Sequence, residues 1–364
     1  MRTFFTLPIL LLAAAVARAE DPLVVLAAAR TGHIEFFDAS LSPLGAIGVN
    51  QLVESVTASP DGRRLYIAQE NLYSVPGSCC GLFSLDMETH NMCFLAAPAL
   101  FGTPSADGRF LFTQGDGGVD LFDARTLGRL PTMKAPGAYN LQPSPDGRWL
   151  LGVTNSPKPS LDIFDMKSRM LARQLPMPAG PVTGAWARDR FYLFNYSFEG
   201  VPEKGWLWSV KPEDGQLSAA RPINLPDLHG ACKQPVLLML AGAPDKLFLA
   251  EAFGFKMDRR RACPDLPMGG IYAIQPSTGQ VSKIAEAVHV NRMAVTPDGH
   301  DLYVLQSTWR NRRREAGLLR IDVRTGLVTN NTLLERGDWN LALAHIPPAL
   351  IPRGTVRASS YCSR

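Results

Sequence analysis

The chain has 364 residues, and its 37 Lys and Arg against 33 Asp and Glu leave a formal net charge of only +4. So small a charge argues against nucleic acid as a partner, because domains that bind nucleic acids usually carry a strong excess of positive charge. With 31 Gly, 29 Pro and no long segment of helical periodicity, the composition favours many short strands joined by turns.

The first residues have the pattern of a secretory signal peptide. Arg2 precedes an apolar run from Phe4 to Val16, and the small-x-small sequence Ala17-Arg18-Ala19 follows it. The apolar run is too short to span a membrane, and no later stretch reaches the roughly 20 apolar residues that a spanning helix needs. We therefore expect residues 1–19 to be removed near Ala19, leaving a periplasmic or secreted chain without a membrane span.

One unit recurs along the rest of the chain. It consists of an apolar strand, a Pro-Asp-Gly or Ala-Asp-Gly turn, a second strand, a loop, a third strand ending in Asp, a turn and a fourth strand. The clearest copies of its first half occupy residues 56–68, 103–114, 141–153 and 293–305. A period of roughly 40 to 50 residues with four strands per unit is typical of a β-propeller, in which four-stranded blades pack around a central channel.

The two ends of the chain complement each other. The N-terminal segment supplies only three strands, whereas "LALAHIPPALIPRG" near the C-terminus matches a first strand with its turn. One blade is therefore shared by residues 23–50 and 340–353. Six further units begin near Val53, Gly102, Tyr139, Val182, Pro235 and Asn291. We predict an all-β, seven-bladed propeller with four-stranded blades over residues 20–353, followed by a C-terminal tail over residues 354–364.

The repeat resembles that of the YVTN-type seven-bladed propellers, which share its Ser-Pro-Asp-Gly, Leu-Tyr-Val and Asp-x-x-Thr-Gly patterns. Within that group, "LYVLQSTWRNRRREAGLLRIDVRTGLV" (302–328) is similar to a late blade of the heavy, propeller subunit of bacterial amine dehydrogenases. Because that subunit does not carry the quinone cofactor, the resemblance implies a binding or scaffold role beside a redox partner. It also implies that this chain holds no cofactor of its own.

In the geometry of this family, the loops between second and third strands share one face with the connectors between blades. The six cysteines of the mature chain are an even set in an oxidising compartment, which favours disulfides over a metal site. This geometry favours the pairs Cys232–Cys263 and Cys93–Cys362, with Cys93 opposite Asp86, and leaves a vicinal bridge between Cys79 and Cys80. A rearranged pairing of the six is the alternative.

Two basic clusters fall in the second loops of the sixth and seventh blades, and one further arginine lies nearby in a connector. The candidate binding residues are Lys256, Arg259, Arg260, Arg261, Arg292, Arg310, Arg312, Arg313 and Arg314. They form either an ordinary solvated surface or a docking patch for an acidic protein or an anionic small ligand. The second hypothesis rests on the ability of guanidinium groups to bind carboxylates bidentately.

Sequence motifs for catalysis are missing, since the chain has no Gly-x-Ser-x-Gly elbow, phosphate-binding loop or His-Glu-x-x-His motif. The remaining candidates are His289 near the channel mouth, as a general acid or base, and Glu251 at the end of a second strand. The alternative function is therefore a propeller enzyme of the lactonase or lyase type. Such an enzyme would hold a divalent metal at the channel mouth.

Overall fold

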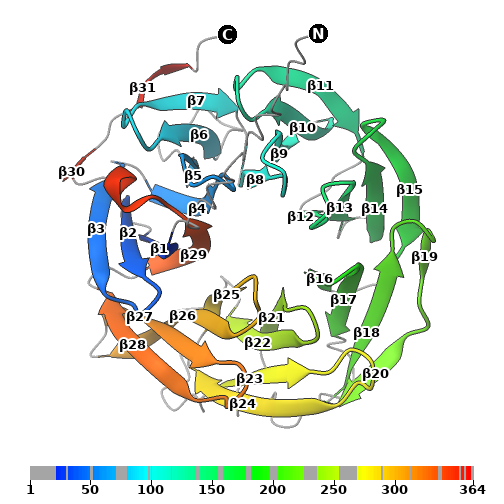
Figure 1. The fold of residues 1–364 in the computed structure, drawn as a ribbon. Helices are drawn as coiled ribbons and strands as arrows, with labels where there is room; N and C mark the ends of the chain where they lie inside the picture. The colour runs from blue at the N-terminus through cyan, green and yellow to red at the C-terminus, as the bar shows by residue number, and fades with distance from the viewer. Residues whose placement is uncertain are drawn as a thin grey trace, which may run out of the picture.

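Seven sheets stand around a common axis like the blades of a propeller, and they contain nearly all the regular structure (Figure 1). The computed structural model describes residues 22–361 except for 30–31, 50–51, 71–79, 97–98, 100, 116, 136–139, 155–158, 178–181, 197–203, 225–235, 254–268, 288–289, 311–312, 335–337, 352–353 and 356–357. The prediction of an all-β, seven-bladed propeller is confirmed.

From the axis outward, the first blade consists of β29 (Asp338–His345), β1 (Leu23–Ala29), β2 (His33–Asp38) and β3 (Pro43–Gly48). The second consists of β4 (Leu52–Ala58), β5 (Arg64–Glu70), β6 (Cys80–Asp86) and β7 (Met92–Ala96). The third consists of β8 (Thr103–Pro104), β9 (Phe110–Gly115), β10 (Gly118–Asp123) and β11 (Arg129–Lys134). The fourth consists of β12 (Asn140–Pro143), β13 (Trp149–Thr154), β14 (Ser160–Asp165) and β15 (Met170–Pro176).

The fifth blade consists of β16 (Val182–Ala187), β17 (Arg190–Tyr196) and β18 (Lys204–Lys211), with β19 (Gln216–Leu217) and β20 (Arg221–Asn224) both paired to β18. The sixth consists of β21 (Val236–Gly242), β22 (Leu247–Phe253), β23 (Gly269–Ile274) and β24 (Val281–Ala287). The seventh consists of β25 (Val290–Val295), β26 (Asp301–Arg310), β27 (Arg313–Asp322) and β28 (Val328–Leu334). Each of the six units found in the sequence begins within one residue of its expected start.

The ring closes in the first blade, where the last long strand of the chain pairs with the first. β29 runs antiparallel to β1, from Leu23 opposite His345 to Ala28 opposite Asn340. The chain then forms a short 3-10 helix (Pro348–Leu350) and two short strands on the outside of the ring. These are β30 (Gly354–Thr355), parallel to β3, and β31 (Ala358–Tyr361), parallel to β7.

The recurring Ser-Pro-Asp-Gly sequence builds the turn between the first and second strands of a blade. Its hydroxyl donates to the Asp carboxylate two residues on, at 2.6 Å from Ser105 to Asp107 and at 2.5 Å from Thr296 to Asp298. The Gly has a positive φ of 66 to 74° in four of these turns, as at Gly62 and Gly299, and glycine adopts that conformation at little cost. The motif is therefore explained by turn geometry and carries no information about function.

The core lies in layers between neighbouring blades, because each sheet buries both faces. Between the second and third blades, for example, Tyr66 and Leu82 pack with Leu111 and Phe122. Hydrogen bonds between neighbouring blades add to this packing. For example, Thr57 Oγ1 donates to the main-chain oxygen of Gly102 at 2.6 Å. The result is a rigid ring on which the loops and strand ends are held in fixed positions.

Candidate functional site

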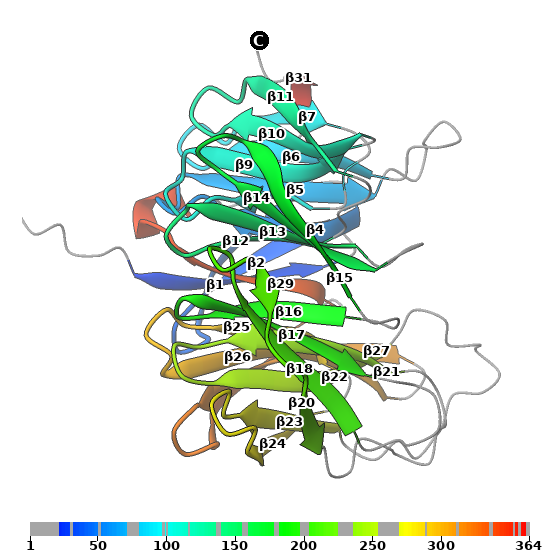
Figure 2. The ribbon, with the colours of Figure 1, turned by 90° about the vertical axis from the view of Figure 1, so that its right-hand side faces the viewer.

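The two edges of the ring differ in what they present. In the second blade Leu52 lies opposite Glu70 and Glu70 opposite Cys80, so β4 begins, β5 ends and β6 begins at the same edge. At the opposite edge the two turns meet, since the main-chain nitrogen of Met87 donates to the oxygen of Arg63 at 2.9 Å. We call the first edge the connector face and the second the turn face. The connector face is on the right in Figure 2.

Three neighbouring innermost strands each carry one extra residue close to the connector face. The extra residues are Glu54 in β4, Asn291 in β25 and Trp339 in β29. Around Glu54, for example, Val53 and Ser55 pair with the consecutive residues Gln69 and Ala68. Such bulges redirect side chains and are common beside functional sites. The bulges in the seventh, first and second blades therefore mark one sector of the ring around the axis.

Arg292 directly follows the bulge in β25 and brings a positive charge to this sector. Arg292 is exposed to solvent, yet neighbouring protein atoms partly desolvate its guanidinium. This desolvation lowers the pKa of the Arg292 guanidinium below its ordinary value, and the negative charge of Glu54 opposes that effect. Its Nη1 donates to the main-chain oxygen of Asn291 at 3.3 Å. A charged group that is only partly solvated attracts an anion more strongly than one in open water.

The second and third strands of the seventh blade continue beyond its innermost strand. β26 and β27 pair from Asp301 opposite Asp322 to Arg310 opposite Arg313, whereas β25 begins opposite Gln306. The four additional rungs extend the hairpin past the innermost strand by roughly 13 Å at about 3.3 Å per residue. We call these rungs, residues 307–310 and 313–316, the basic hairpin, and they belong to the connector face.

The basic hairpin corrects the sequence prediction in this region. We expected residues 310–314 to form a charged loop, but Arg310, Arg313 and Arg314 lie in strands. The preceding Thr308 and Trp309 are residue types that favour extended structure, which lets the ladder continue to the tip. Arg292, expected in a connector, lies within β25. Glu251 lies in β22, opposite Leu238.

The other candidates fall outside the described residues, so the roles given to them stay predictions. They are Lys256, Arg259, Arg260, Arg261, Arg312, His289, Cys79, Cys232, Cys263 and Cys362. In the described part of the chain, no group of three or more His, Cys, Asp and Glu side chains is placed to hold a metal ion. No helix found there is long and apolar enough to cross a lipid bilayer.

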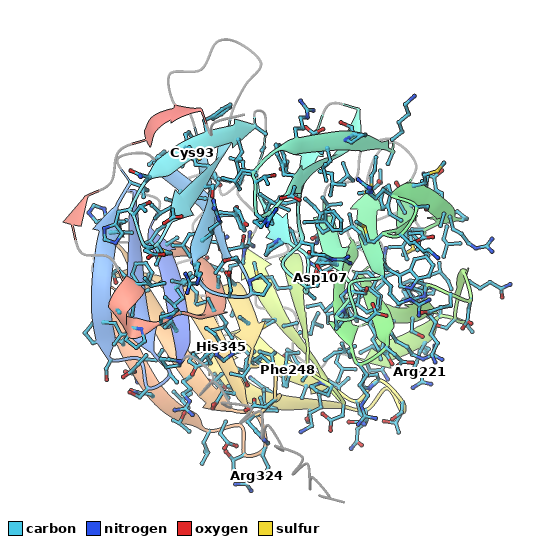
Figure 3. All side chains as sticks on the ribbon, turned by 45° about the horizontal axis from the view of Figure 1, so that its top comes forward. Cys93, Asp107, Arg221, Phe248, Arg324 and His345 are labelled. Carbon is cyan, nitrogen blue, oxygen red and sulfur yellow. The ribbon has the colours of Figure 1, made fainter. Side chains whose placement is uncertain are left out.

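Cys93 is bonded in a disulfide. It lies in β7, the outermost long strand of the second blade (Figure 3), opposite Ser84 and not opposite Asp86 as expected. The difference arises because the turn begins directly after Asp86, whose main-chain nitrogen donates to the oxygen of Asn91 at 2.9 Å. β31 lies beside β7, with Ser360 opposite Cys93, and ends one residue before Cys362. The pairing of Cys93 with Cys362 stays a prediction.

Two further features at the connector face of the seventh, first and second blades were not found from the sequence. A bulge cannot be recognised from the sequence of one strand, because it arises where one strand has an extra residue relative to the strand with which it pairs. The place of Glu54 beside Arg292 was missed for the same reason. Its position in β4, at the start of the second unit, was the only signal the sequence contained.

No protein-family model matches the sequence, and no curated protein matches it. Solved structures do match. The chain is similar to Kuenenia stuttgartiensis hydrazine synthase, with 14% identity, a TM-score of 0.54, and coverage of 74% of this chain and 76% of that one. It is also similar to the dihydro-heme d1 dehydrogenase NirN in complex with DHE, with 16% identity, a TM-score of 0.55, and coverage of 88% and 74%. At these identities the likeness shows a shared propeller fold.

Proposed function

We propose that this chain is a secreted or periplasmic binding propeller whose connector face docks an acidic protein partner. The observation that supports the proposal is the position of the basic hairpin in the same blade as Arg292, and at the same face of that blade. Arginines on a rigid scaffold can bind partner carboxylates bidentately without the cost of ordering a loop. Charge of this kind mainly increases the rate of encounter and selects the orientation of the partner.

The partner that fits best is a redox protein. This narrower proposal rests on the resemblance of residues 302–328 to the propeller subunit of amine dehydrogenases. The structurally similar chains include a dehydrogenase, whose name denotes redox chemistry, beside a hydrazine synthase. In such a complex this chain would position the partner, and the partner would carry the redox cofactor.

Binding of fluorescein-labelled poly-glutamate at low ionic strength tests the docking face. We expect the wild-type chain to bind the peptide and to lose affinity as salt is added, because exposed charges are screened within about 10 Å at 0.1 M salt. The double variant Arg313→Glu, Arg314→Glu should raise the dissociation constant at least tenfold. Arg125→Glu, Arg324→Glu is the control with the same change in charge, since both are exposed arginines on the turn face. Equal binding by the wild type and the Arg313→Glu, Arg314→Glu variant would refute the assignment.

A further inference from the structure

Asp120 and Asp162 occupy equivalent places in the third and fourth blades. Each lies in the third strand, three residues before the Asp that begins the following turn, in the sequences "VDLFD" and "LDIFD". Both side chains are directed toward the preceding blade. Asp120 lines a cavity together with Phe94 of the second blade, and Asp162 is on the same face of its strand as Phe164, which packs with residues of the third blade.

In the third blade a neighbouring cation neutralises the carboxylate. The side chain of Asp120 is 9% exposed, and its Oδ1 accepts hydrogen bonds from Arg129 Nη2 at 2.7 Å and Thr132 Oγ1 at 2.8 Å. Arg129 lies opposite Phe122 in the register of the blade. In the fourth blade the corresponding Phe164 lies opposite Leu171, so the cation is replaced by an apolar side chain.

Asp162 is therefore a carboxylate without a counter-charge among the described residues. It is fully buried, and both of its hydrogen bonds go to Oδ1, from Ser160 Oγ at 3.0 Å and from Gln174 Nε2 at 2.9 Å. Its Oδ2 is buried and has no hydrogen-bond partner. An ionised carboxylate left in this state is costly by several kcal/mol, which a proton or a cation would relieve.

Two more oxygens without partners lie at the same interface. Thr154 Oγ1 belongs to the residue opposite Ser160, on the face of the fourth blade that Asp162 shares. Gln114 Oε1 comes from the third blade, two residues after Phe112 and so on the face that packs against Leu150 and Phe164. An amide oxygen accepts hydrogen bonds and cannot donate, and a hydroxyl can do both. Together with Asp162 they give this interface three hard oxygen atoms that lack a partner.

We propose that one hard cation of the calcium class binds between the third and fourth blades, coordinated by Asp162 Oδ2, Gln114 Oε1 and Thr154 Oγ1. Calcium binds six to eight oxygen ligands, including carboxylates, amide carbonyls and water, so water would complete the shell. With one carboxylate the site is weak, with a dissociation constant on the order of 10⁻⁴ to 10⁻³ M, as in extracellular modules. Burial raises the pKa of the Asp162 carboxyl, so a proton competes with the cation.

Thermal unfolding of the full chain at pH 7.5, with and without CaCl₂ at matched ionic strength, tests this proposal. For a dissociation constant of about 1 mM, 10 mM calcium multiplies the folded-to-unfolded ratio about elevenfold, a rise in Tm of roughly 2 °C. Asp162→Asn should abolish the rise and still fold, because its amide can donate to Gln114 Oε1 in place of the cation. Asp120→Asn is the matched control: it should lower Tm and keep the calcium response.

Titration calorimetry with CaCl₂ provides the second measurement, and we expect about one site in the wild type and none in Asp162→Asn. Two results would overturn the proposal. In the first, calcium does not change the Tm of the wild type, and lowering the pH from 8 to 5 raises the Tm of the wild type but not that of Asp162→Asn. A proton, and not a cation, would then neutralise Asp162. In the second, calcium stabilises Asp162→Asn as much as the wild type, which places the ion elsewhere.

Discussion

The hydroxyl of Tyr303 in β26 donates a hydrogen bond of 2.7 Å to the main-chain oxygen of Ala39, and so joins the seventh blade to the first across 264 residues of sequence. Tyr66 occupies the equivalent place in the second blade, within "RLYIA" against "DLYVL". Both side chains are buried, but the hydroxyl of Tyr66 has no hydrogen-bond partner. A comparison of the two tyrosines therefore separates the contribution of the hydroxyl's hydrogen bond to stability from the contribution of the buried aromatic ring.

We expect Tyr303→Phe to lower the free energy of unfolding by about 1–2 kcal/mol, because it leaves the oxygen of Ala39 without its donor. Tyr66→Phe should be neutral or slightly stabilising, since it removes a buried hydroxyl that has no partner. Urea denaturation of the three proteins checks the comparison. Equal losses in both variants would show that the bond from Tyr303 does not stabilise closure of the ring.

Gly62 connects the turn of the second blade to the closing strand of the first. It has a positive φ of 66°, and a Cβ placed on it would collide with the main-chain oxygen of His345. Gly108, in the equivalent turn of the third blade, has a φ of 69°, and its Cβ would meet nothing closer than Pro60 Cδ at 3.5 Å. Gly108→Ala should therefore cost only the conformational strain, about 1–2 kcal/mol.

Gly62→Ala should cost about 1–3 kcal/mol more than Gly108→Ala, because the main chain of the first blade must move. Differential scanning calorimetry of the two variants measures the difference. The same Tm for both would mean that β29 is not held against this turn in solution.

The turn at Thr296 predicts a specific loss of stability in acid. The hydrogen bond from Thr296 Oγ1, followed by one from the main chain of His300, holds the pKa of Asp298 below its usual 3.8. A lowered pKa in the folded state stabilises the protein above pH 3.8 and loses this effect as the pH falls further. Thr296→Ala should therefore be less stable than the wild type at pH 7, and the difference should shrink toward pH 2.

Thr329→Ala is the control for that experiment. Its hydroxyl donates at 3.3 Å to the main-chain oxygen of Arg320. A main-chain oxygen does not titrate, so this hydrogen bond does not depend on pH. Its effect on stability should thus be the same at both pH values. A difference for Thr296→Ala that stays constant with pH would contradict the assigned coupling to Asp298.

Peptide mapping without reduction tests the predicted disulfides. We expect one fragment that joins the peptides of Cys93 and Cys362, a second that joins Cys232 and Cys263, and Cys79 and Cys80 in one peptide whose mass is lower by two hydrogens. The disulfide of Cys93 and the position of β31 beside β7 support the first pair. A link between Cys93 and Cys79 or Cys80 would refute both that pair and the vicinal bridge.

The sequence predicts the ring well because the same physical constraints recur in every blade. Turn residues with positive φ, such as Gly62, and the alternation of apolar residues in each strand locate the blades, and the unmatched ends predict the closure. The site is harder to predict, because it depends on how strands pair. The bulge at Glu54 and the four extra rungs that carry Arg310 and Arg313 appear only when β4 and β26 are aligned with their partners.

The proposed function requires that the connector face, and not the turn face, binds the partner. Site-specific photo-crosslinking in the native host tests it directly, with a benzophenone side chain placed at Arg310 of the basic hairpin or at Leu327. Leu327 lies on the turn face of the same blade and is 65% exposed. We predict a partner adduct from position 310, lost when Arg313→Glu and Arg314→Glu are added, and none from position 327. An adduct from position 327 alone would show that the turn face binds the partner.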